Sequence, residues 1–321
     1  MRTIKRVQPL DLDILHSLYK YRILTVPQLR KLHFSNSYAY RKLSILKQSG
    51  LVATEPLLRR GRKATSLYRL TDRGIGLLHE HGRINQTVKS SDLKIHADRR
   101  AYHLHVNDIL IELSLAGWQV MDSRETKARH NIDRGDLVQG CITNRDGQSW
   151  FIYLFLQDAE EVSVIKALNQ IGTHNRNVAV FFMGQGSMDK FIEKQEQLGT
   201  VTSGQMLLLP YEYGLHLLRT YQTAEDYIRL FRSYGDIRDI GHPNFSHVIR
   251  IAGEWRYLVN LLGNDLMKVF ELQRMTPARL NGRRVHAFVP ERMLGQYRQW
   301  LGGQPWVDLA PLSVTELRFT G

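Results

Sequence analysis

Residues 24–70 read LTVPQLRKLHFSNSYAYRKLSILKQSGLVATEPLLRRGRKATSLYRL, and this stretch decides the fold of the N-terminal part of the chain. Thr25 is a good N-cap, because its side-chain oxygen can accept a free backbone N–H, and Pro27 is tolerated early in a helix. A turn at residues 33–35 and a second helix from about Ser37 follow, and Gly50 ends that helix. Alternating residues then predict a β-hairpin. This order predicts a winged helix-turn-helix.

The second helix of this stretch is expected to be amphipathic. Ala39, Leu43 and Leu46 recur every three to four positions and predict its buried face. The opposite face is expected to contact the major groove of duplex DNA through polar and basic side chains. These are Ser37, Tyr38, Tyr40, Arg41, Lys42 and Lys47. The hairpin tip adds Arg59, Arg60, Arg62 and Lys63 as contacts to the DNA backbone. The alternative is a small helical domain whose polar face is merely solvated.

The positive charge of the chain is concentrated at its N-terminal end. Residues 1–100 contain 21 Lys and Arg against 7 Asp and Glu, a difference of +14, whereas residues 101–321 contain 23 against 24. Such a field favours binding to DNA by the release of condensed counterions. A basic membrane-surface patch is the competing interpretation. It is disfavoured because no amphipathic helix with exposed aromatic residues accompanies these cations.

The composition predicts a folded protein of the cytoplasm. Hydrophobic residues make up 43% of the 321 positions, and no stretch reaches the roughly 18 to 20 apolar residues of a membrane span. The N-terminus MRTIKRVQPL lacks the apolar core of a signal peptide. The single cysteine, Cys141, excludes an internal disulfide and a Cys-based zinc site, and we expect it to be a small buried residue.

Further elements follow on both sides of this stretch. Residues 9–21 and a segment capped by Thr71 are expected to be helical, and residues 79–92 to be a linker. A helix near residues 96–116 precedes strands at 118–124, 137–143 and 150–156, a helix at 160–171 and a strand at 178–183. Beyond this, strands are expected at 207–209, 283–289 and 314–319, and helices at 211–218, 223–231, within 255–270 and at 290–301. Residues 124–135 are expected to be an irregular polar stretch.

The ordered succession of motifs over residues 10–183 resembles the replication-relaxation family, which includes MobC-like plasmid mobilisation proteins. The resemblance rests on LTVPQLRKLHF, YRKLSILKQSGLV, SLYRLTDRG and HLHVNDILIEL. It implies an α+β protein in which the winged helix-turn-helix (residues 1–85) precedes a mixed α/β, restriction-endonuclease-like domain (93–204). An α+β C-terminal region (205–321) would then serve in dimerisation or partner binding.

The resemblance also implies where a nuclease site would lie. Glu125, Asp136 and Asp158 would be its acidic residues, but Leu156 stands where the family has an acidic metal ligand, and no Lys follows two residues later. Magnesium needs several oxygen ligands. We therefore expect a degenerate site with no metal, unless Glu112 substitutes, and Mg²⁺ as a cofactor only if activity is retained. Exposed loop or helix-capping roles are the alternative for these carboxylates.

These observations predict a sequence-specific, double-stranded DNA-binding protein of a plasmid, conjugative element or other mobile element. We expect it to act in replication initiation or mobilisation as a non-catalytic accessory factor, as a homodimer, with replication, transfer or transposition proteins as further partners and no membrane contact. The alternatives are an active metal-dependent relaxase or nickase and an autonomous transcription repressor. Arg279, Arg283 and Arg284 could form a second anion contact or belong to a solvated edge strand.

Overall fold

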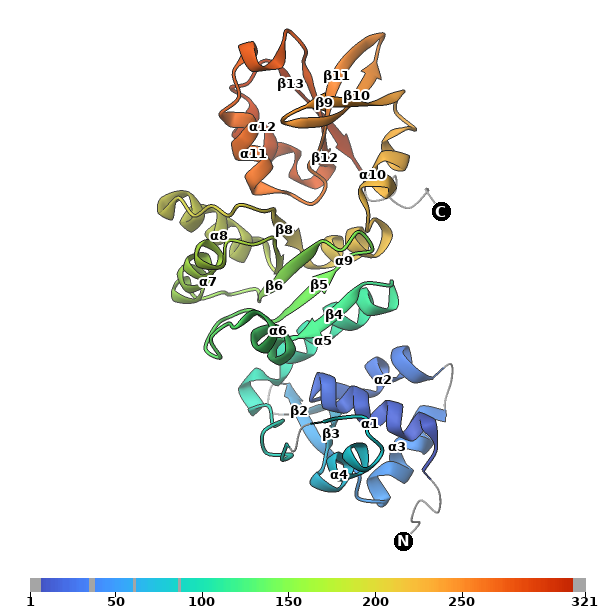
Figure 1. Ribbon diagram of the computed structural model, residues 1–321. Helices are drawn as coiled ribbons and strands as arrows, with labels where there is room; N and C mark the ends of the chain where they lie inside the picture. The colour runs from blue at the N-terminus through green and yellow to red at the C-terminus, as the bar shows by residue number, and fades with distance from the viewer. Residues whose placement is uncertain (1–6, 35–37, 60–61, 86–87, 314–321) are drawn as a thin grey trace. The chain divides into compact units, whose positions relative to one another are not determined.

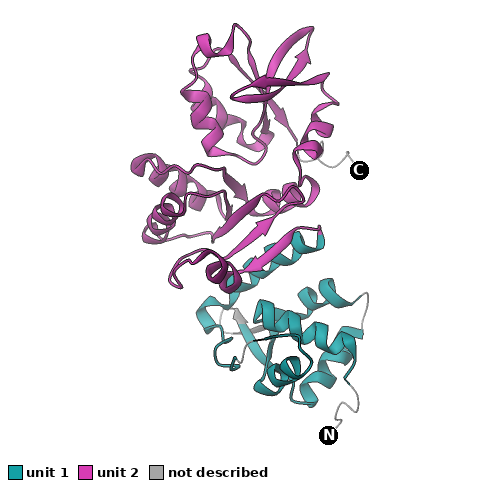
Figure 2. Ribbon diagram, in the orientation of Figure 1, with its two compact units in different colours: residues 1–115 teal, residues 116–321 magenta. Residues whose placement is uncertain are grey.

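The structure, a computed structural model, describes residues 7–34, 38–59, 62–85 and 88–313 (Figure 1). The chain divides into two compact units, residues 1–115 and residues 116–321 (Figure 2). Both units combine helices with β-sheet, as the sequence predicts for an α+β protein. Among the described residues, every helix is too short or too polar to cross a bilayer.

The first unit contains four helices in the order expected from the sequence, together with a small sheet and one further long helix. Its elements are α1 (Pro9–Tyr21), β1 (Leu24–Thr25), α2 (Val26–His33), α3 (Tyr38–Gln48), β2 (Val52–Arg59), β3 (Arg62–Leu70), α4 (Asp72–Glu80), the 3-10 turn η1 (Ala97–Arg99) and α5 (Arg100–Leu115). The expected hairpin is confirmed, because β2 and β3 pair antiparallel from Val52↔Leu70 to Arg59↔Arg62. Strand β1, which was not expected, pairs with β3.

Helix α5 belongs to the first compact unit. Its buried Asn107 donates through Nδ2 to Tyr21 O at 3.1 Å and to Ile23 O at 2.7 Å. These hydrogen bonds satisfy backbone carbonyls at the end of α1 and just after it, so α5 contributes to the core of this unit. The periodicity of residues 96–116 predicts the helix but not the surface against which it packs.

The second unit begins with a sheet of order β4-β5-β6-β7-β8. Its elements are β4 (Gln119–Asp122), α6 (Ser123–His130), β5 (Gly140–Thr143), β6 (Ser149–Phe155), α7 (Glu161–His174), β7 (Val178–Phe182), α8 (Gln185–Leu198), β8 (Met206–Pro210), α9 (Tyr211–Thr220) and α10 (Ala224–Phe231). Strands β4, β5 and β6 are antiparallel neighbours, and β6, β7 and β8 are parallel. The strands and α7 were expected; α6 and α8 were not.

A second sheet, of order β13-β12-β11-β10-β9, completes this unit. Its elements are β9 (Ile237–His242), β10 (Phe245–Ile251), β11 (Glu254–Asn260), α11 (Leu266–Gln273), the turn η2 (Pro277–Leu280), β12 (Val285–Pro290), the turn η3 (Glu291–Met293), α12 (Leu294–Leu301) and β13 (Val307–Leu312). Strand β12 and helix α12 confirm two expected elements. Helix α11 begins within residues 255–270, where a helix was expected, and it follows strand β11, which was not expected. The strand expected at 314–319 lies outside the described residues.

The two sheets of the second unit share one hydrophobic core. Asn264 donates through Nδ2 to Leu208 O at 2.8 Å, and Asp265 accepts a hydrogen bond from Met206 N at 3.1 Å. Both side chains are buried. Strand β8 is therefore bonded to the loop before α11 as well as to β7.

Candidate nucleic-acid interface

Helix α3 presents a polar face to solvent, as its sequence predicts. Ala39, Leu43 and Leu46 are fully buried, whereas Tyr38 and Tyr40 are 47% and 61% exposed. Arg41, Ser44, Lys47 and Gln48 are also exposed. Ser37 lies outside the described residues. The exposed residues recur three and four positions apart and therefore share one side of the helix.

Lys42 does not belong to this exposed face, and this corrects the prediction. Its ammonium Nζ lies 2.6 Å from Asp11 Oδ1 of α1, and both side chains are buried. Lys42 Nζ also donates to Gln8 Oε1 at 3.2 Å. A charged residue at a buried helical position is stable only when it is paired. The partner lies 31 positions earlier in the chain, so the spacing within α3 could not reveal it.

Two contributors to the exposed face, Ser44 and Gln48, were missed by the sequence analysis. Ser44 follows Tyr40 by four residues, and Gln48 follows Ser44 by four, with Gln48 Nε2 donating to Ser44 Oγ at 3.4 Å. Both side chains can donate and accept hydrogen bonds. The helical repeat that places Tyr40 and Arg41 on the surface would have been sufficient to identify them.

Helix α2 is fixed at its start by a capping box. Thr25 accepts from Gln28 N at 3.3 Å, and Gln28 Oε1 accepts from Thr25 N at 2.9 Å. Gln28 is buried and donates through Nε2 to Leu104 O and Asp108 Oδ1 of α5 at 3.1 and 3.0 Å. Burial raises the pKa of Asp108, and the bond from Gln28 opposes that rise. One glutamine thus both caps α2 and attaches it to α5.

Side chains at the end of α2 and at the start of α3 are held by tertiary contacts. His33 Nε2 lies 2.8 Å from Ser17 Oγ of α1, and burial lowers the pKa of this imidazole. The ring of Phe34 meets the ring of Tyr38 edge to face, with centroids 6.2 Å apart. This contact fixes the first turn of α3 relative to α2, and so orients the exposed face.

The β2–β3 hairpin is anchored at its base by Glu55. This carboxylate accepts from Arg69 Nε at 2.6 Å and pairs with Arg100 of α5. Within the hairpin, burial raises the pKa of Tyr68 of β3, and the neighbouring Tyr40 contributes to the rise. Strands β2 and β3 extend to Arg59 and Arg62, so the tip is shorter than expected. Residues 60 and 61 lie outside the described residues, as do the side chains of Arg59, Arg62 and Lys63.

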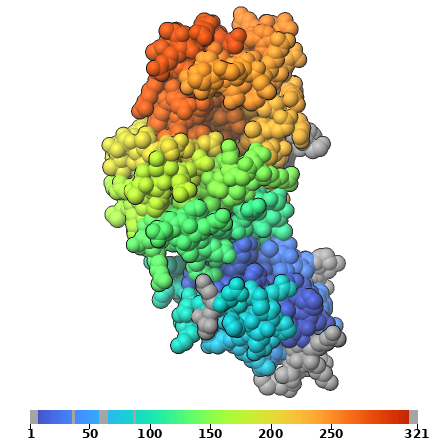
Figure 3. Space-filling view, viewed as in Figure 1, coloured from blue at the N-terminus to red at the C-terminus, as the bar shows by residue number. Residues whose placement is uncertain are grey.

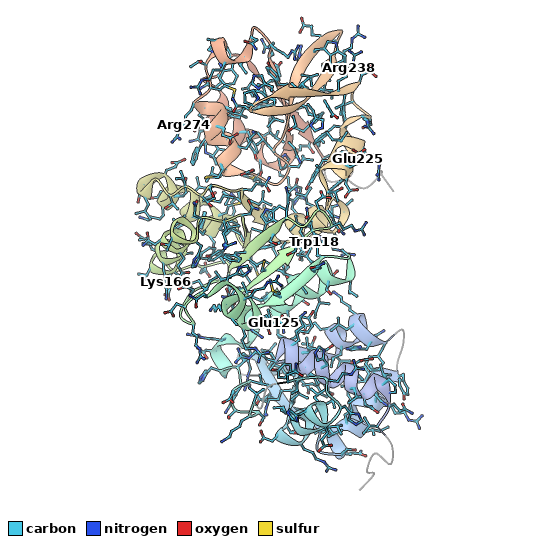
Figure 4. The ribbon with its side chains drawn as sticks, in the orientation of Figure 1. Trp118, Glu125, Lys166, Glu225, Arg238 and Arg274 are labelled. Atoms are coloured by element: carbon cyan, nitrogen blue, oxygen red, sulfur yellow. The ribbon has the colours of Figure 1, made fainter. Side chains whose placement is uncertain are left out.

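Two of the three candidate nuclease carboxylates, Glu125 and Asp158, are exposed. Glu125 completes a capping box at the start of α6: its Oε2 accepts from Asp122 N at 3.0 Å, while Asp122 Oδ1 accepts from Glu125 N at 2.8 Å. Figure 4 labels Glu125 on this helix. The capping role that the sequence left open for these carboxylates therefore applies to Glu125.

The third carboxylate, Asp136, fastens a loop to α7. Its Oδ1 accepts from Gln170 Nε2 at 2.9 Å, and its Oδ2 lies 2.9 Å from His174 Nε2. The adjoining backbone is held by Lys127 Nζ, which donates to Asp136 O at 2.6 Å. Burial lowers the pKa of Lys127. Asp136, Gln170 and His174 line a pocket of about 430 Å³, together with Val162, Ile165, Lys166, Asn169 and Thr173.

Within the described residues, no group of three or more His, Cys, Asp or Glu side chains is arranged to hold a metal ion. Glu125, Asp136 and Asp158 accordingly do not converge. Leu156, which stands at an expected ligand position, is 37% exposed. Glu112, which could have substituted, forms an ion pair with Lys31 of α2.

Comparison with known proteins gives one family match. Residues 15–151 match the model of the family described as replication-relaxation, which confirms the resemblance noted in the sequence over those residues. The match includes α2, α3, the hairpin, α5 and the strands β4 and β5. The comparison with curated proteins and the comparison with solved structures each found no match.

Proposed function

We propose that this chain, whose residues 15–151 match the replication-relaxation family, is a sequence-specific double-stranded DNA-binding protein. It would act in replication initiation or mobilisation of a plasmid or other mobile element, as a non-catalytic accessory factor. The observation that carries the proposal is the exposed polar face of α3 in the part of the chain that holds the excess of positive charge.

The first unit has the element order of a winged helix-turn-helix, α1–β1–α2–α3–β2–β3. In such a domain, α3 is the recognition helix and the hairpin is the wing. Tyr40, Arg41, Ser44 and Gln48 would read base edges, because Arg can bond to guanine O6 and N7 and an amide can bond to adenine. Lys47 and the wing cations Arg59, Arg60, Arg62 and Lys63 would contact phosphates.

We propose a non-catalytic role because the expected acidic residues make structural contacts or are replaced by an apolar residue. Glu125 caps α6, Asp136 pairs with His174, and Leu156 offers no ligand atom. Phosphodiester hydrolysis in such a fold would need oxygen ligands converging on one ion. A homodimer on an inverted repeat is the usual means by which one recognition helix gains specificity, and we include it in the proposal.

The decisive experiment uses the pure protein and a supercoiled plasmid that carries the native flanking DNA of its gene. Footprinting and nicking are measured on the same samples in Mg²⁺, Mn²⁺ or EDTA. We expect a discrete footprint with two symmetric half-sites, unchanged in EDTA, and no conversion to the nicked circle.

Two results would contradict this proposal in different ways. Absence of a footprint at a protein concentration that saturates nonspecific binding would remove the sequence-specific function. Metal-dependent nicking that disappears in Asp136→Ala would instead establish a nickase and remove the non-catalytic role. An Asp158→Ala protein serves as the control, because Asp158 is exposed and lies outside the network around Asp136.

A further inference from the structure

The second sheet of the second unit separates its arginines by face. Cross-strand partners share a face, so Arg238, Val248 and Tyr257 lie on one side of β9, β10 and β11. Side chains alternate along each strand, which adds Arg250 and Trp255 to that side. Arg256, His286 and Asp308 lie on the other side by the same register.

On that other side, the arginines have carboxylate partners. Arg256 Nη1 lies 2.8 Å from Asp308 Oδ2, and Arg284 Nε donates to the same oxygen at 2.9 Å. These pairs lower the pKa of Asp308. Arg284, one of the three residues considered for a second anion contact, is therefore neutralised within the fold.

On the first side, the arginines stand over aromatic rings instead. The guanidinium of Arg238 lies 4.4 Å from the centroid of Trp255, and that of Arg283 lies 5.1 Å from the centroid of Tyr257. Arg250 is directly opposite Trp255 in the β10–β11 register. Among the described residues, Arg238, Arg250 and Arg283 have no carboxylate within ion-pair distance. We call Arg238, Arg250, Trp255 and Arg283 the arginine–tryptophan face.

The arginines of this group reach solvent, whereas Val248 and Tyr257 on the same side of the sheet are buried in the core. Arg238 and Arg250 are exposed, and Trp255 and Arg283 are partly exposed. Figure 4 labels Arg238 beside strands β9 and β10, and the residues of these strands, light orange, lie at the surface in Figure 3. Neighbouring strands are about 4.8 Å apart, so three unneutralised guanidinium groups lie within a few strand widths. Their mutual repulsion is relieved when a polyanion binds.

We propose that the arginine–tryptophan face binds single-stranded DNA, separately from the duplex-binding surface proposed for α3. The cations supply contacts to successive phosphates, and the partly exposed indole and the guanidinium planes offer surfaces on which unpaired bases stack. A duplex could use the cations but not the rings, because its bases are already stacked on one another. The ring contacts therefore favour a single strand as the ligand.

The regional charge agrees with this assignment. Residues 237–313 contain 10 Lys and Arg against 6 Asp and Glu, a difference of +4. Residues 116–236 contain 12 against 15, a difference of −3. The near-neutral average of the C-terminal two thirds of the chain thus conceals a basic sheet.

The test uses the full chain and a labelled 20-nucleotide oligo(dT), with affinity measured by fluorescence anisotropy. Saturating unlabelled duplex is present to occupy the first unit. We expect Arg238→Ala/Arg283→Ala to weaken oligo(dT) binding at least tenfold. The slope of log K against log salt should also become less steep by about 1.4, from two lost phosphate contacts. Trp255→Leu should weaken binding at least fivefold with little change in that slope.

A matched control removes two other exposed arginines of this region, at the end of α11 and within α12, Arg274→Ala/Arg298→Ala. Figure 4 labels Arg274 beside α11. This protein has the same net charge as the test variant and should retain oligo(dT) affinity within about twofold. Arg238→Lys/Arg283→Lys preserves charge and should retain the salt slope. If the alanine variant fails to fold, this lysine variant still tests whether the guanidinium planes contribute to binding beyond their charge.

The outcomes separate this inference from the proposed function. Arg41→Ala/Lys47→Ala should impair duplex binding and leave oligo(dT) binding unchanged. If the native protein does not bind duplex DNA but binds oligo(dT), the proposed function is wrong and the single-strand site stands. Equal losses in the test and control pairs, or no loss in Trp255→Leu, would overturn the single-strand site.

Discussion

Lys42 Nζ of α3 lies 2.6 Å from Asp11 Oδ1 of α1, and both side chains are buried. The adjacent residue, Arg41, is exposed. Two consecutive basic residues of one helix thus have opposite roles, because successive positions on a helix differ in direction by about 100°. Lys42 holds the helix against the core, and Arg41 remains available for a partner.

This relationship predicts different stability effects for the two residues. Lys42→Ala leaves the Asp11 carboxylate buried without its counter-charge, and should lower the free energy of unfolding by about 3–5 kcal/mol. Arg41→Ala should change it by less than about 0.5 kcal/mol. Urea unfolding monitored by circular dichroism measures both. A Lys42→Ala protein as stable as the native chain would show that the ion pair is not formed.

Arg41→Ala should relax discrimination between DNA sequences. If Arg41 bonds to a guanine, its loss should weaken binding to the native site about tenfold and alter binding to unrelated duplex by less than about twofold. Competition binding with the two duplexes measures the ratio. Lys47→Ala is the control, expected to weaken both equally. If Arg41→Ala weakens binding to the native site and to unrelated duplex equally, Arg41 contacts a phosphate and not a base.

Reversal of charge at the hairpin tip should weaken DNA binding irrespective of sequence. In Arg60→Glu/Arg62→Glu, two phosphate contacts are lost, so the slope of log K against log salt should become less steep by about 1.8. Titration at several salt concentrations gives that slope. Arg292→Glu/Arg298→Glu, which carries the same charge change near α12, is the comparison. If Arg60→Glu/Arg62→Glu binds DNA as tightly as the native chain, the wing is not part of the DNA interface.

Asp136→Ala should destabilise the protein instead of abolishing a reaction. The substitution leaves Gln170 Nε2 and His174 Nε2 without their acceptor, which should cost about 1–3 kcal/mol of unfolding free energy. Asp158→Ala, at an exposed position, should cost less than about 0.5 kcal/mol. Chemical denaturation of both proteins gives the comparison. Equal stability of the two variants would argue against the loop-fastening role of Asp136.

Asp265 makes the stability of the second unit depend on pH. Burial raises the pKa of this carboxyl from 3.8 to about 6, against the opposing effect of backbone donors such as Met206 N and Met267 N. Between these two values the folded state binds more protons than the unfolded state. The free energy of unfolding contributed by Asp265 therefore falls as pH rises from about 4 to about 6, and stays low above that.

Asp265→Asn removes this titration while keeping an oxygen that can accept from Met206 N and Met267 N. The melting temperature of the variant minus that of the native chain should therefore increase between pH 4 and pH 7. A difference that is constant over this range would show that the pKa of Asp265 is not raised.

The second unit illustrates where the sequence signal was sufficient and where it was not. Strands β6 and β7 are continuous apolar runs, and their positions were predicted closely. Helix α6 was missed because its SRETKARH sequence has no apolar stripe, and only Thr126 is buried. Its start is set by the Asp122–Glu125 capping box, a local signal weaker than hydrophobic periodicity. Strand β11 was missed because its apolar run is short.

The sequence by itself determined the helices and hairpin of the first unit, the buried stripe of α3 and the location of the positive charge. Each of these depends on residues that are neighbours along the chain. Tertiary structure alone decided that Lys42 faces Asp11, that Asp136 meets His174 and that Arg284 is neutralised while Arg283 is not. These pairings join distant segments, because long-range packing and the cost of burying an unpaired charge select them.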